Sequence, residues 1–253
     1  MHLPPVGLGT MGIDDPATVT AAVDAGYRHL DTAQIYDNEG VVGSGVAAAD
    51  ADRGDLTVAT KLWIDSLASA DVRPGTEASL DRLGLDRVDL LYVHRPRGDY
   101  DPAATLPALE EVREAGLTDR VGLSNFEPDQ LATAREHLDA VAAHQVEFHP
   151  FFWSEDLLAD AREGGYPLVA YSPLAGGAVF DDPTIRAIAD DHDTSPAAVS
   201  IAWATSYDPV VTIPKASSRA HLEANLAAAE LVLTDDEVAR IEAIEREAEL
   251  FPE

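Results

Sequence analysis

The stretch PATVTAAVDAGYRHLDTAQIY, residues 16 to 36, contains the unit that is repeated along the rest of the chain. Residues 16–25 carry a helical pattern, and Gly26 follows them as expected of a helix C-cap. The run YRHLD at 27–31 comes next and has the length and composition of a buried strand. The stretch therefore predicts a helix that leads directly into a strand.

Similar short runs, rich in β-branched and aliphatic residues, alternate with helical patterns along the whole chain. Such an alternation predicts βαβ units and a parallel sheet. Eight runs predict strands, at 3–9, 27–31, 56–61, 88–94, 119–124, 143–148, 167–172 and 210–214. Eight is the strand number of a TIM barrel, and 253 residues are the length of one such barrel. We therefore expect an α/β fold, a single (β/α)8 TIM barrel domain over 1–253.

The helical patterns fill the intervals between these runs. Three of them begin with proline after an N-cap candidate, which suits the first turn of a helix. The predicted helices are 16–25, 39–50, 68–83, 102–115, 128–138, 154–164, 195–206 and 218–229. A further helix is expected over 234–250, outside the barrel. The longest irregular stretch, 173–194, follows the seventh strand and is a candidate lid.

Composition narrows the classes of function. The chain has no cysteine, which excludes disulfides and thiolate chemistry and fits a reducing compartment. Its net charge is -29, from 46 acidic against 17 basic residues, so nucleic acid and anionic membrane surfaces are not expected partners. No apolar run is long enough for a membrane span. We expect a cytoplasmic, monomeric protein with an acidic surface adapted to high salt.

Polar residues stand at the ends of nearly all the predicted strands. In a TIM barrel, the carboxyl ends of the strands and the loops after them carry the active site. Only two lysines occur among the 17 basic residues, and both stand at strand ends. The polar residues at this rim are Asp31, Tyr36, Lys61, His94, Ser124, Asn125, Gln145, Glu147, Tyr171, Ser172 and Lys215.

Four of these residues can form a site for proton transfer. A tyrosine titrates near ~10 in water, and a neighbouring ammonium lowers that pKa toward neutrality. Lys61 can supply the ammonium for Tyr36, and Asp31 can hold Lys61 charged and oriented. The His94 imidazole can hydrogen-bond a substrate carbonyl. We expect Tyr36, Lys61, Asp31 and His94 to be catalytic.

Other interpretations of the same residues remain open at this point. Asp31 and Lys61 can form a purely structural ion pair, and His94 can be structural. A lyase with Lys61 as a Schiff base is a second enzyme hypothesis. A regulatory subunit that binds a cofactor without turnover is a third. His144 and His149 lie five residues apart, on opposite faces of one strand, so no metal site is expected.

The motifs around these residues resemble the aldo-keto reductase family, in particular its small prokaryotic members, over essentially the whole chain. Three segments match the catalytic motifs in order and spacing: GYRHLDTAQIY at 26–36, TKLW at 60–63 and LLYVHRP at 90–96. Four more are similar to the cofactor-binding segments: VGLSNF at 121–126, HQVEFHP at 144–150, AYSPL at 170–174 and TIPKA at 212–216. The resemblance implies hydride transfer between a nicotinamide cofactor and an aldehyde, ketone or keto-sugar, with tyrosine as general acid.

The resemblance also implies the roles of the cofactor-binding residues. Ser124, Asn125 and Gln145 would bind the nicotinamide carboxamide. Tyr171 would stack on the nicotinamide ring, and Lys215 would meet the phosphate on the adenosine side. These groups suit their ligands, because amides pair with amides, aromatic faces with planar rings and point charges with phosphate. The remaining residues carried over from these segments are Ser172, Leu174, Ala216, His221 and Asn225.

The last of these segments departs from the family pattern. The family usually has serine after the lysine and then an arginine and a glutamate around the adenosine, whereas this chain has Ala216, His221 and Ala224 and retains Asn225. A protonated His221 is a weaker anion clamp than the fork of an arginine. NADP(H) is the first expectation and NAD(H) the alternative.

The expected substrate pocket departs as well. Arg95 follows His94 where many members have tryptophan, and the chain lacks a long C-terminal pocket loop, which predicts an open pocket. Trp63 and Phe126 would provide apolar walls beside Tyr36. Arg95 would meet a carboxylate or a sugar hydroxyl, or it pairs only with a surface acid.

Overall fold

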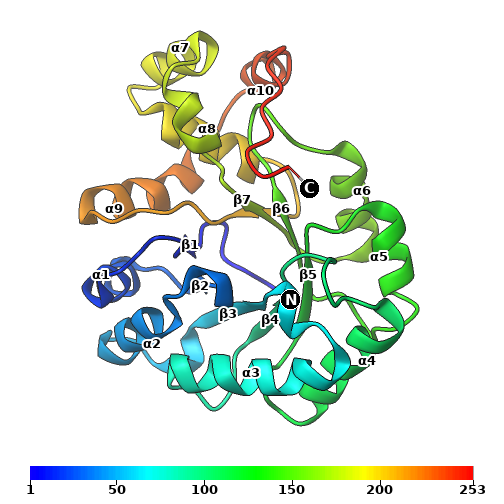
Figure 1. Cartoon of the computed structure of the whole chain (residues 1–253). Coiled ribbons are helices and arrows are strands. Elements are labelled where there is room, and N and C mark those ends of the chain that lie inside the picture. The colour runs from blue at the N-terminus through cyan, green and yellow to red at the C-terminus, as the bar shows by residue number, and fades with distance from the viewer. Residues whose placement is uncertain (253) are drawn as a thin grey trace.

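The computed structural model describes residues 1–252 and shows eight parallel strands surrounded by helices (Figure 1). The strands follow one another in sequence order, β1 to β8, and each pairs in parallel with the next. A parallel bridge between Val6 and Thr212 brings the first and last strands together, and Gly7 N donates to Thr212 O at 2.7 Å. The fold is the expected (β/α)8 barrel.

Each strand lies within one of the runs that the sequence marks, except that β3 extends one residue beyond its run, to Leu62. Their inward and outward residues are almost all buried, because helices cover the outer face and side chains fill the barrel interior. The strands are β1 Leu8–Gly9, β2 His29–Asp31, β3 Thr57–Leu62, β4 Leu90–Val93, β5 Val121–Ser124, β6 His144–Glu147, β7 Leu168–Tyr171 and β8 Val210–Thr212.

The helices also follow the expected order, and most begin where a capping residue satisfies free backbone N–H groups. Asp101 caps α4, and Ser195 caps α8. The helices are α1 Pro16–Ala25, α2 Glu39–Ala48, α3 Ser69–Leu83, α4 Pro102–Glu114, α5 Pro128–Ala134, α6 Glu155–Gly164, α7 Pro183–Asp191, α8 Pro196–Thr205, α9 Arg219–Ala227 and α10 Asp235–Glu242.

The segment 173–194 was expected to be irregular, but the structure shows that it contains regular elements. It contains the 3-10 turns Ala175–Phe180 and then α7, which Asp182 caps with its side chain. Ile185 and Ile188 of α7 are buried at helical spacing and anchor the segment to the barrel. Only its first part, up to Phe180, reaches the cavity described below.

The predicted length of the last helix, 234–250, is also wrong, because α10 ends at Glu242. Beyond it, tertiary hydrogen bonds take the backbone N–H groups that a helix would use. Ala248 N donates to Phe151 O at 3.0 Å, and Leu250 N and Phe251 N both donate to the Glu147 carboxylate. This C-terminal segment, residues 243–252, therefore crosses the carboxyl end of the barrel.

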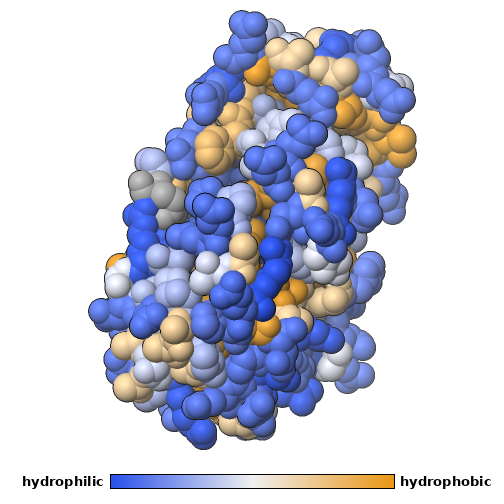
Figure 2. All heavy atoms as spheres, turned by 90° about the vertical axis from the view of Figure 1, so that its right-hand side faces the viewer, coloured by the Kyte–Doolittle hydropathy of each residue, from blue (hydrophilic) through white to orange (hydrophobic). Residues whose placement is uncertain are grey.

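Charged residues cover the outside of the molecule. Of the acidic side chains in the described chain, only those of Asp31, Glu39, Glu147 and Asp182 are buried. Hydrophilic residues cover most of the face shown in Figure 2, with small apolar patches between them. None of the helices in residues 1–252 has the length and apolar character of a membrane span.

Removal of salt is expected to destabilise this protein. In molar salt the Debye length is about 3 Å, which screens the repulsion among surface carboxylates, whereas dilute buffer leaves that repulsion at long range. Differential scanning calorimetry from molar KCl to dilute buffer should show the melting temperature falling by several degrees. A melting temperature that stays constant over this range would contradict the expectation.

Candidate active site

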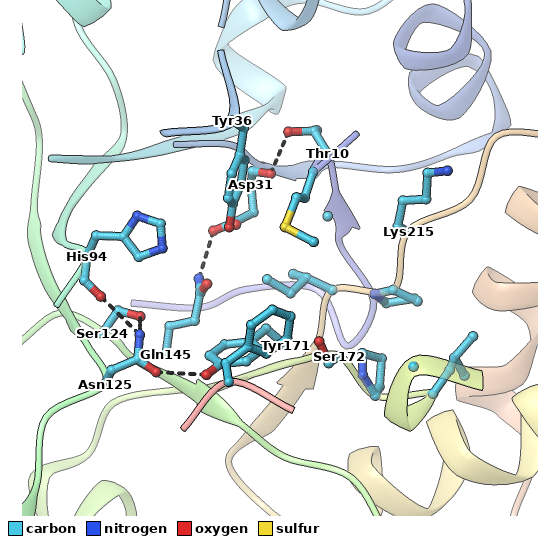
Figure 3. Close-up of a pocket in the computed structure, with 18 of the residues that line it drawn as sticks. Thr10, Asp31, Tyr36, His94, Ser124, Asn125, Gln145, Tyr171, Ser172 and Lys215 are labelled. Carbon is cyan, nitrogen blue, oxygen red and sulfur yellow. Dashed lines mark hydrogen bonds between the residues drawn. The ribbon is translucent and has the colours of Figure 1, made fainter. Parts of the chain in front are cut away.

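A cavity of about 580 Å³ opens at the carboxyl ends of the strands (Figure 3). Most of the polar residues that the sequence places at the rim meet here, because parallel strands of a barrel end at one face. It is lined by residues of β1, β2, β5, β6 and β7, by the loops after β1, β2, β3, β4, β5, β7 and β8, and by the C-terminal segment. The expected site residues among them are Asp31, Tyr36, Trp63, His94, Arg95, Ser124, Asn125, Gln145, Tyr171, Ser172, Leu174 and Lys215.

A buried ion pair lies at the base of this cavity. Lys61 Nζ donates to an Asp31 carboxylate oxygen and, at 2.8 Å, to Thr32 O. Gln145 Nε2 donates to the other Asp31 oxygen at 2.7 Å. Lys61 is fully buried and Asp31 is 1% exposed, so each charge depends on these partners. The pair fixes a positive charge at one position below the cavity.

Tyr36 projects over this charge. It ends the short 3-10 turn Gln34–Tyr36 after β2, and its ring centroid lies 5.0 Å from Lys61 Nζ. The Gln34 side chain holds this turn against α3 and the residue after β3, because Nε2 donates to Gly75 O at 3.0 Å and Oε1 accepts from Trp63 N at 2.7 Å. The phenol and the ammonium therefore meet at the cavity base.

The titration of Tyr36 differs from the sequence expectation, whereas that of Lys61 agrees with it. Burial raises the pKa of Tyr36, and the positive charge of Lys61 offsets that rise only in part. The expected lowering of the Tyr36 pKa toward neutrality is therefore wrong for the protein without ligands, because the effect of desolvation exceeds that of the Lys61 ammonium. Burial alone would lower the pKa of Lys61, but Asp31 and Tyr36 raise it. Tyr36 is thus a neutral phenol and Lys61 an ammonium at neutral pH.

His94 stands directly after β4, beside Tyr36. The two ring centroids are 5.8 Å apart and the rings are perpendicular, while the Trp63 ring lies 4.9 Å from the imidazole on another side. Burial, together with the positive charges of Lys61 and Arg95, lowers the pKa of His94 to about 2. His94 is therefore a neutral imidazole. Its Nδ1 is buried without a hydrogen-bond partner in residues 1–252, so Nε2 is the ring nitrogen that can reach a ligand in the cavity.

A second group of polar side chains forms the opposite wall. Tyr171 Oη donates to Asn125 Oδ1 at 2.9 Å, and Asn125 Nδ2 donates to His94 O at 3.0 Å and to Ser124 Oγ at 3.1 Å. Asn125 and Ser172 have positive φ values of 60° and 52°, a conformation that ordinary residues adopt only where the surroundings enforce it. This wall is therefore fixed in place by its own contacts.

These residues fit a nicotinamide. A carboxamide needs both donors and acceptors, which Ser124, Asn125 and Gln145 supply at one wall, and the half-buried Tyr171 ring adds an aromatic surface beside them. Lys215 lines the far end of the cavity (Figure 3), and its exposed ammonium donates to Ser217 Oγ at 3.0 Å. A phosphate can reach it there.

Three cofactor residues implied by the resemblance stand outside the cavity lining. Ala216 is buried in the core, and His221 is exposed in the first turn of α9. Asn225 is 6% exposed and hydrogen-bonds Tyr27, so the protein itself uses its side chain. These residues follow Lys215 along one segment, and their role toward the cofactor stays a prediction.

The substrate-pocket expectations need one correction. Trp63 and Arg95 line the cavity, but Phe126 does not. Phe126 is 1% exposed and packs in the core edge-on to Tyr100, with ring centroids 5.6 Å apart. Phe126 turns inward because its backbone N donates to His144 Nε2 at 3.3 Å.

The sequence analysis missed the wall formed by the C-terminal segment. Phe251 lines the cavity, and its ring meets that of Tyr171 at a centroid distance of 5.8 Å. The Glu147 carboxylate, which His149 Nε2 also contacts at 2.8 Å, holds the segment through Leu250 N and Phe251 N. The pocket is thus less open than expected. The apolar pair in LFPE at the end of an acidic helix pattern was the available signal.

Comparisons with known proteins agree with this site. The sequence model of the Aldo/keto reductase family matches residues 5–246. An "Aldo-keto reductase" of Mycolicibacterium vanbaalenii is 36% identical over 99% of this chain and 91% of its own length. The "Methylglyoxal reductase DkgB" of Escherichia coli O157:H7 is 34% identical over 97% and 94%.

Solved structures agree as well. A crystal structure described as a putative 2,5-diketo-D-gluconic acid reductase B superposes with a TM-score of 0.91 at 35% identity, covering 95% of this chain and 87% of that one. The aldo-keto reductase MGS-M4, from a Medee basin deep-sea metagenome library, gives 0.94 at 28% identity, covering 100% and 95%. The fold, the rim residues and these relatives lead to one conclusion: the chain belongs to the aldo/keto reductase family.

Proposed function

We propose that this protein reduces the carbonyl group of an aldehyde, ketone or keto-sugar with a nicotinamide cofactor, and that Tyr36 is the general acid. The observation that carries the proposal is the meeting of a neutral phenol, a buried ammonium and a neutral imidazole at one end of a cavity whose other walls suit a nicotinamide. The relatives named as reductases support the same reaction class.

Each residue of the cluster has one task in this reaction. His94 donates a hydrogen bond from Nε2 to the carbonyl oxygen and holds it near the Tyr36 hydroxyl. Tyr36 gives its proton to the oxygen as negative charge develops there. Lys61 stabilises the resulting phenolate, because its ammonium is fixed below the ring. Asp31 keeps Lys61 charged and in place.

The cofactor would be held along the second wall, with its carboxamide at Ser124, Asn125 and Gln145, its ring at Tyr171 and a phosphate at Lys215. When bound, the nicotinamide supplies the hydride that reduces the carbonyl carbon. Ala216 and His221 stand where the family has stronger 2′-phosphate ligands, which makes the preference for NADP(H) over NAD(H) a matter for measurement.

Lys61 is poorly suited to the rival role of a Schiff-base nucleophile. Asp31 and Tyr36 raise the pKa of Lys61 against the effect of burial, so the amine stays protonated, and its side chain is fully buried. A nucleophilic lysine needs the opposite shift. Borohydride trapping with a carbonyl compound should accordingly leave Lys61 unlabelled.

The proposal is tested by steady-state assays with NADPH and with NADH against a panel of aldehydes, ketones and keto-sugars in molar salt. Loss of nicotinamide absorbance is expected with at least one class of carbonyl and with a higher kcat/KM for NADPH. A higher kcat/KM for NADH would reverse the proposed cofactor order. Absence of turnover with every substrate and both cofactors would contradict the proposed function.

A further inference from the structure

The backbone pairing between β2 and β3 stops before the turn that carries Tyr36. The last paired residues are Asp31 and Ala59, and Thr32 N donates to Ala59 O at 2.9 Å. Strand β3 continues beyond Ala59 to Leu62. In the described chain, the ladder between these two strands therefore does not extend to the turn, and other contacts hold the turn in place.

The Gln34 side chain makes these contacts on the side of β3 and α3. Its Oε1 accepts from Trp63 N at 2.7 Å, in the place of a backbone carbonyl, and its Nε2 donates to Gly75 O at 3.0 Å and to Ser79 Oγ at 3.2 Å. Gly75 leaves room for this approach, since a Cβ there would lie 3.0 Å from Ser66 Cβ and 3.5 Å from Gln34 Nε2. One amide therefore links the turn to the residue after β3 and to α3.

The other end of the turn is fixed by a second amide. Asn38 is 5% exposed, and its Nδ2 donates to Thr10 O at 2.7 Å and to Ile13 O at 3.0 Å. Between Tyr36 and Asn38, Asp37 adopts a φ of 52°, a left-handed conformation that persists in a non-glycine residue where the surroundings enforce it. The turn is therefore held at both ends, by a different side chain at each.

The contact between Gln34 and Trp63 also concerns His94. The Trp63 ring lies edge-on to the imidazole with a centroid distance of 4.9 Å, and the Tyr36 ring lies 5.8 Å from the same imidazole. Gln34 joins the backbone of Trp63 to the turn of Tyr36, and the rings of both residues pack on His94. The proposed acid and the proposed ligand of the carbonyl oxygen thus share one support.

We propose that Gln34 is a positioning residue, which holds the Tyr36 hydroxyl where it can pass its proton to the carbonyl oxygen. Proton transfer needs the two oxygens within hydrogen-bond reach, and a displacement of about 1 Å can lower the rate about 100-fold. Gln34 is not among the described residues that line the cavity, so it acts through Tyr36. The proposal rests on the proposed function, because it assumes that Tyr36 is the acid.

A double-mutant cycle separates positioning from a general effect on the protein. Gln34→Met keeps the length of the side chain and removes its hydrogen bonds, and it is made in the wild-type protein and in Tyr36→Phe. The readout is the rate of NADPH oxidation in a single turnover with an aldehyde, which excludes product release. Gln130→Met is the matched control, because Gln130 Oε1 accepts from Glu127 N at 2.8 Å outside the cavity lining.

Gln34→Met should lower the single-turnover rate about 10- to 100-fold in the wild-type background. In the Tyr36→Phe background it should lower the rate by less than about twofold, because the position of the hydroxyl matters only where the hydroxyl is present. Gln34→Glu keeps an acceptor for Trp63 N and should lose less, and it carries the same cycle if Gln34→Met does not fold. Gln130→Met should keep the wild-type rate.

Hydrogen exchange gives a second readout, without cofactor or substrate. The Trp63 amide should exchange about tenfold faster in Gln34→Met than in the wild-type protein, because its acceptor is lost. Tyr36→Phe should leave that exchange unchanged. Wild-type exchange of the Trp63 amide in Gln34→Met would contradict the contact on which the proposal depends.

The proposal is overturned if Gln34→Met lowers the single-turnover rate by the same factor in both backgrounds, or if it leaves the rate unchanged in the wild-type background. Either result would leave the reductase function intact and would make Gln34 a purely structural residue. If the wild-type protein reduces no carbonyl with either cofactor, the proposed function itself fails, and the positioning role of Gln34 fails with it.

Discussion

Replacement of Tyr36 by phenylalanine is expected to lower kcat for carbonyl reduction by about 10²- to 10⁴-fold, the usual contribution of a positioned general acid. The substitution removes only the hydroxyl that the proposed mechanism places between the Lys61 ammonium and the carbonyl. The ring, 5.0 Å from Lys61 Nζ and edge-on to His94, keeps its packing. The Kd of the cofactor should therefore stay within about twofold of the wild-type value.

Steady-state kinetics and cofactor titration by tryptophan fluorescence measure both quantities on the same preparation. Tyr100→Phe serves as the matched control, because Tyr100 packs on Phe126 outside the cavity and loses the same hydroxyl. Its kcat should resemble that of the wild-type protein. Turnover of Tyr36→Phe within about twofold of wild type would remove Tyr36 from the role of acid.

Acidification is expected to destabilise the protein steeply between about pH 6.5 and 4. Burial lowers the pKa of His29 to about 4, that of His144 to about 3 and that of His94 to about 2. These histidines are neutral in the folded protein and titrate near ~6.5 when unfolded. Below the unfolded pKa, the unfolded chain binds more protons, so stability is complete above about pH 6.5 and falls as pH decreases toward the folded pKa.

The size of this effect follows from the same linkage. Each histidine contributes a slope of about 1.4 kcal/mol per pH unit, so three of them lower the free energy of unfolding by about 4 kcal/mol between pH 7.5 and 5.5. Urea unfolding in molar salt, which screens the surface carboxylates, measures it. His29→Asn should reduce the slope by about one third, whereas the exposed control His221→Asn should leave it unchanged. A stability that is flat from pH 7.5 to 5.5 would contradict burial of these histidines as neutral groups.

Much of the site could be predicted because a barrel converts positions in sequence into positions in space. Asp31 is the last residue of β2, Lys61 is the last but one of β3, and His94 directly follows β4. Because the strands are parallel, these three residues lie at the same end of the barrel. Tyr36 was assignable from the motif that it closes. Gln145, which alternates inward on β6, follows from strand periodicity and reaches the Asp31 carboxylate.

The parts that could not be predicted depend on tertiary contacts and on competing energies. The direction of the pKa shift of Tyr36 depends on whether burial or Lys61 dominates, which no sequence pattern states. Phe126 turns into the core through a bond to His144, and the segment after α10 leaves helical geometry because Glu147 takes its N–H groups. Helix α7, by contrast, had its signals in the cap Asp182 and in Ile185 and Ile188, which sequence reasoning passed over.

The central claim, that the cavity brings a carbonyl between a nicotinamide and the Tyr36 hydroxyl, is tested most directly by isotope tracing. The wild-type protein is given an aldehyde and NADPH that carries deuterium at both C4 positions in ordinary water, and then unlabelled NADPH in heavy water. Mass spectrometry and NMR should find one deuterium on the former carbonyl carbon in the first experiment and none on that carbon in the second. Deuterium on that carbon from heavy water, or a product without label from the cofactor, would contradict the account.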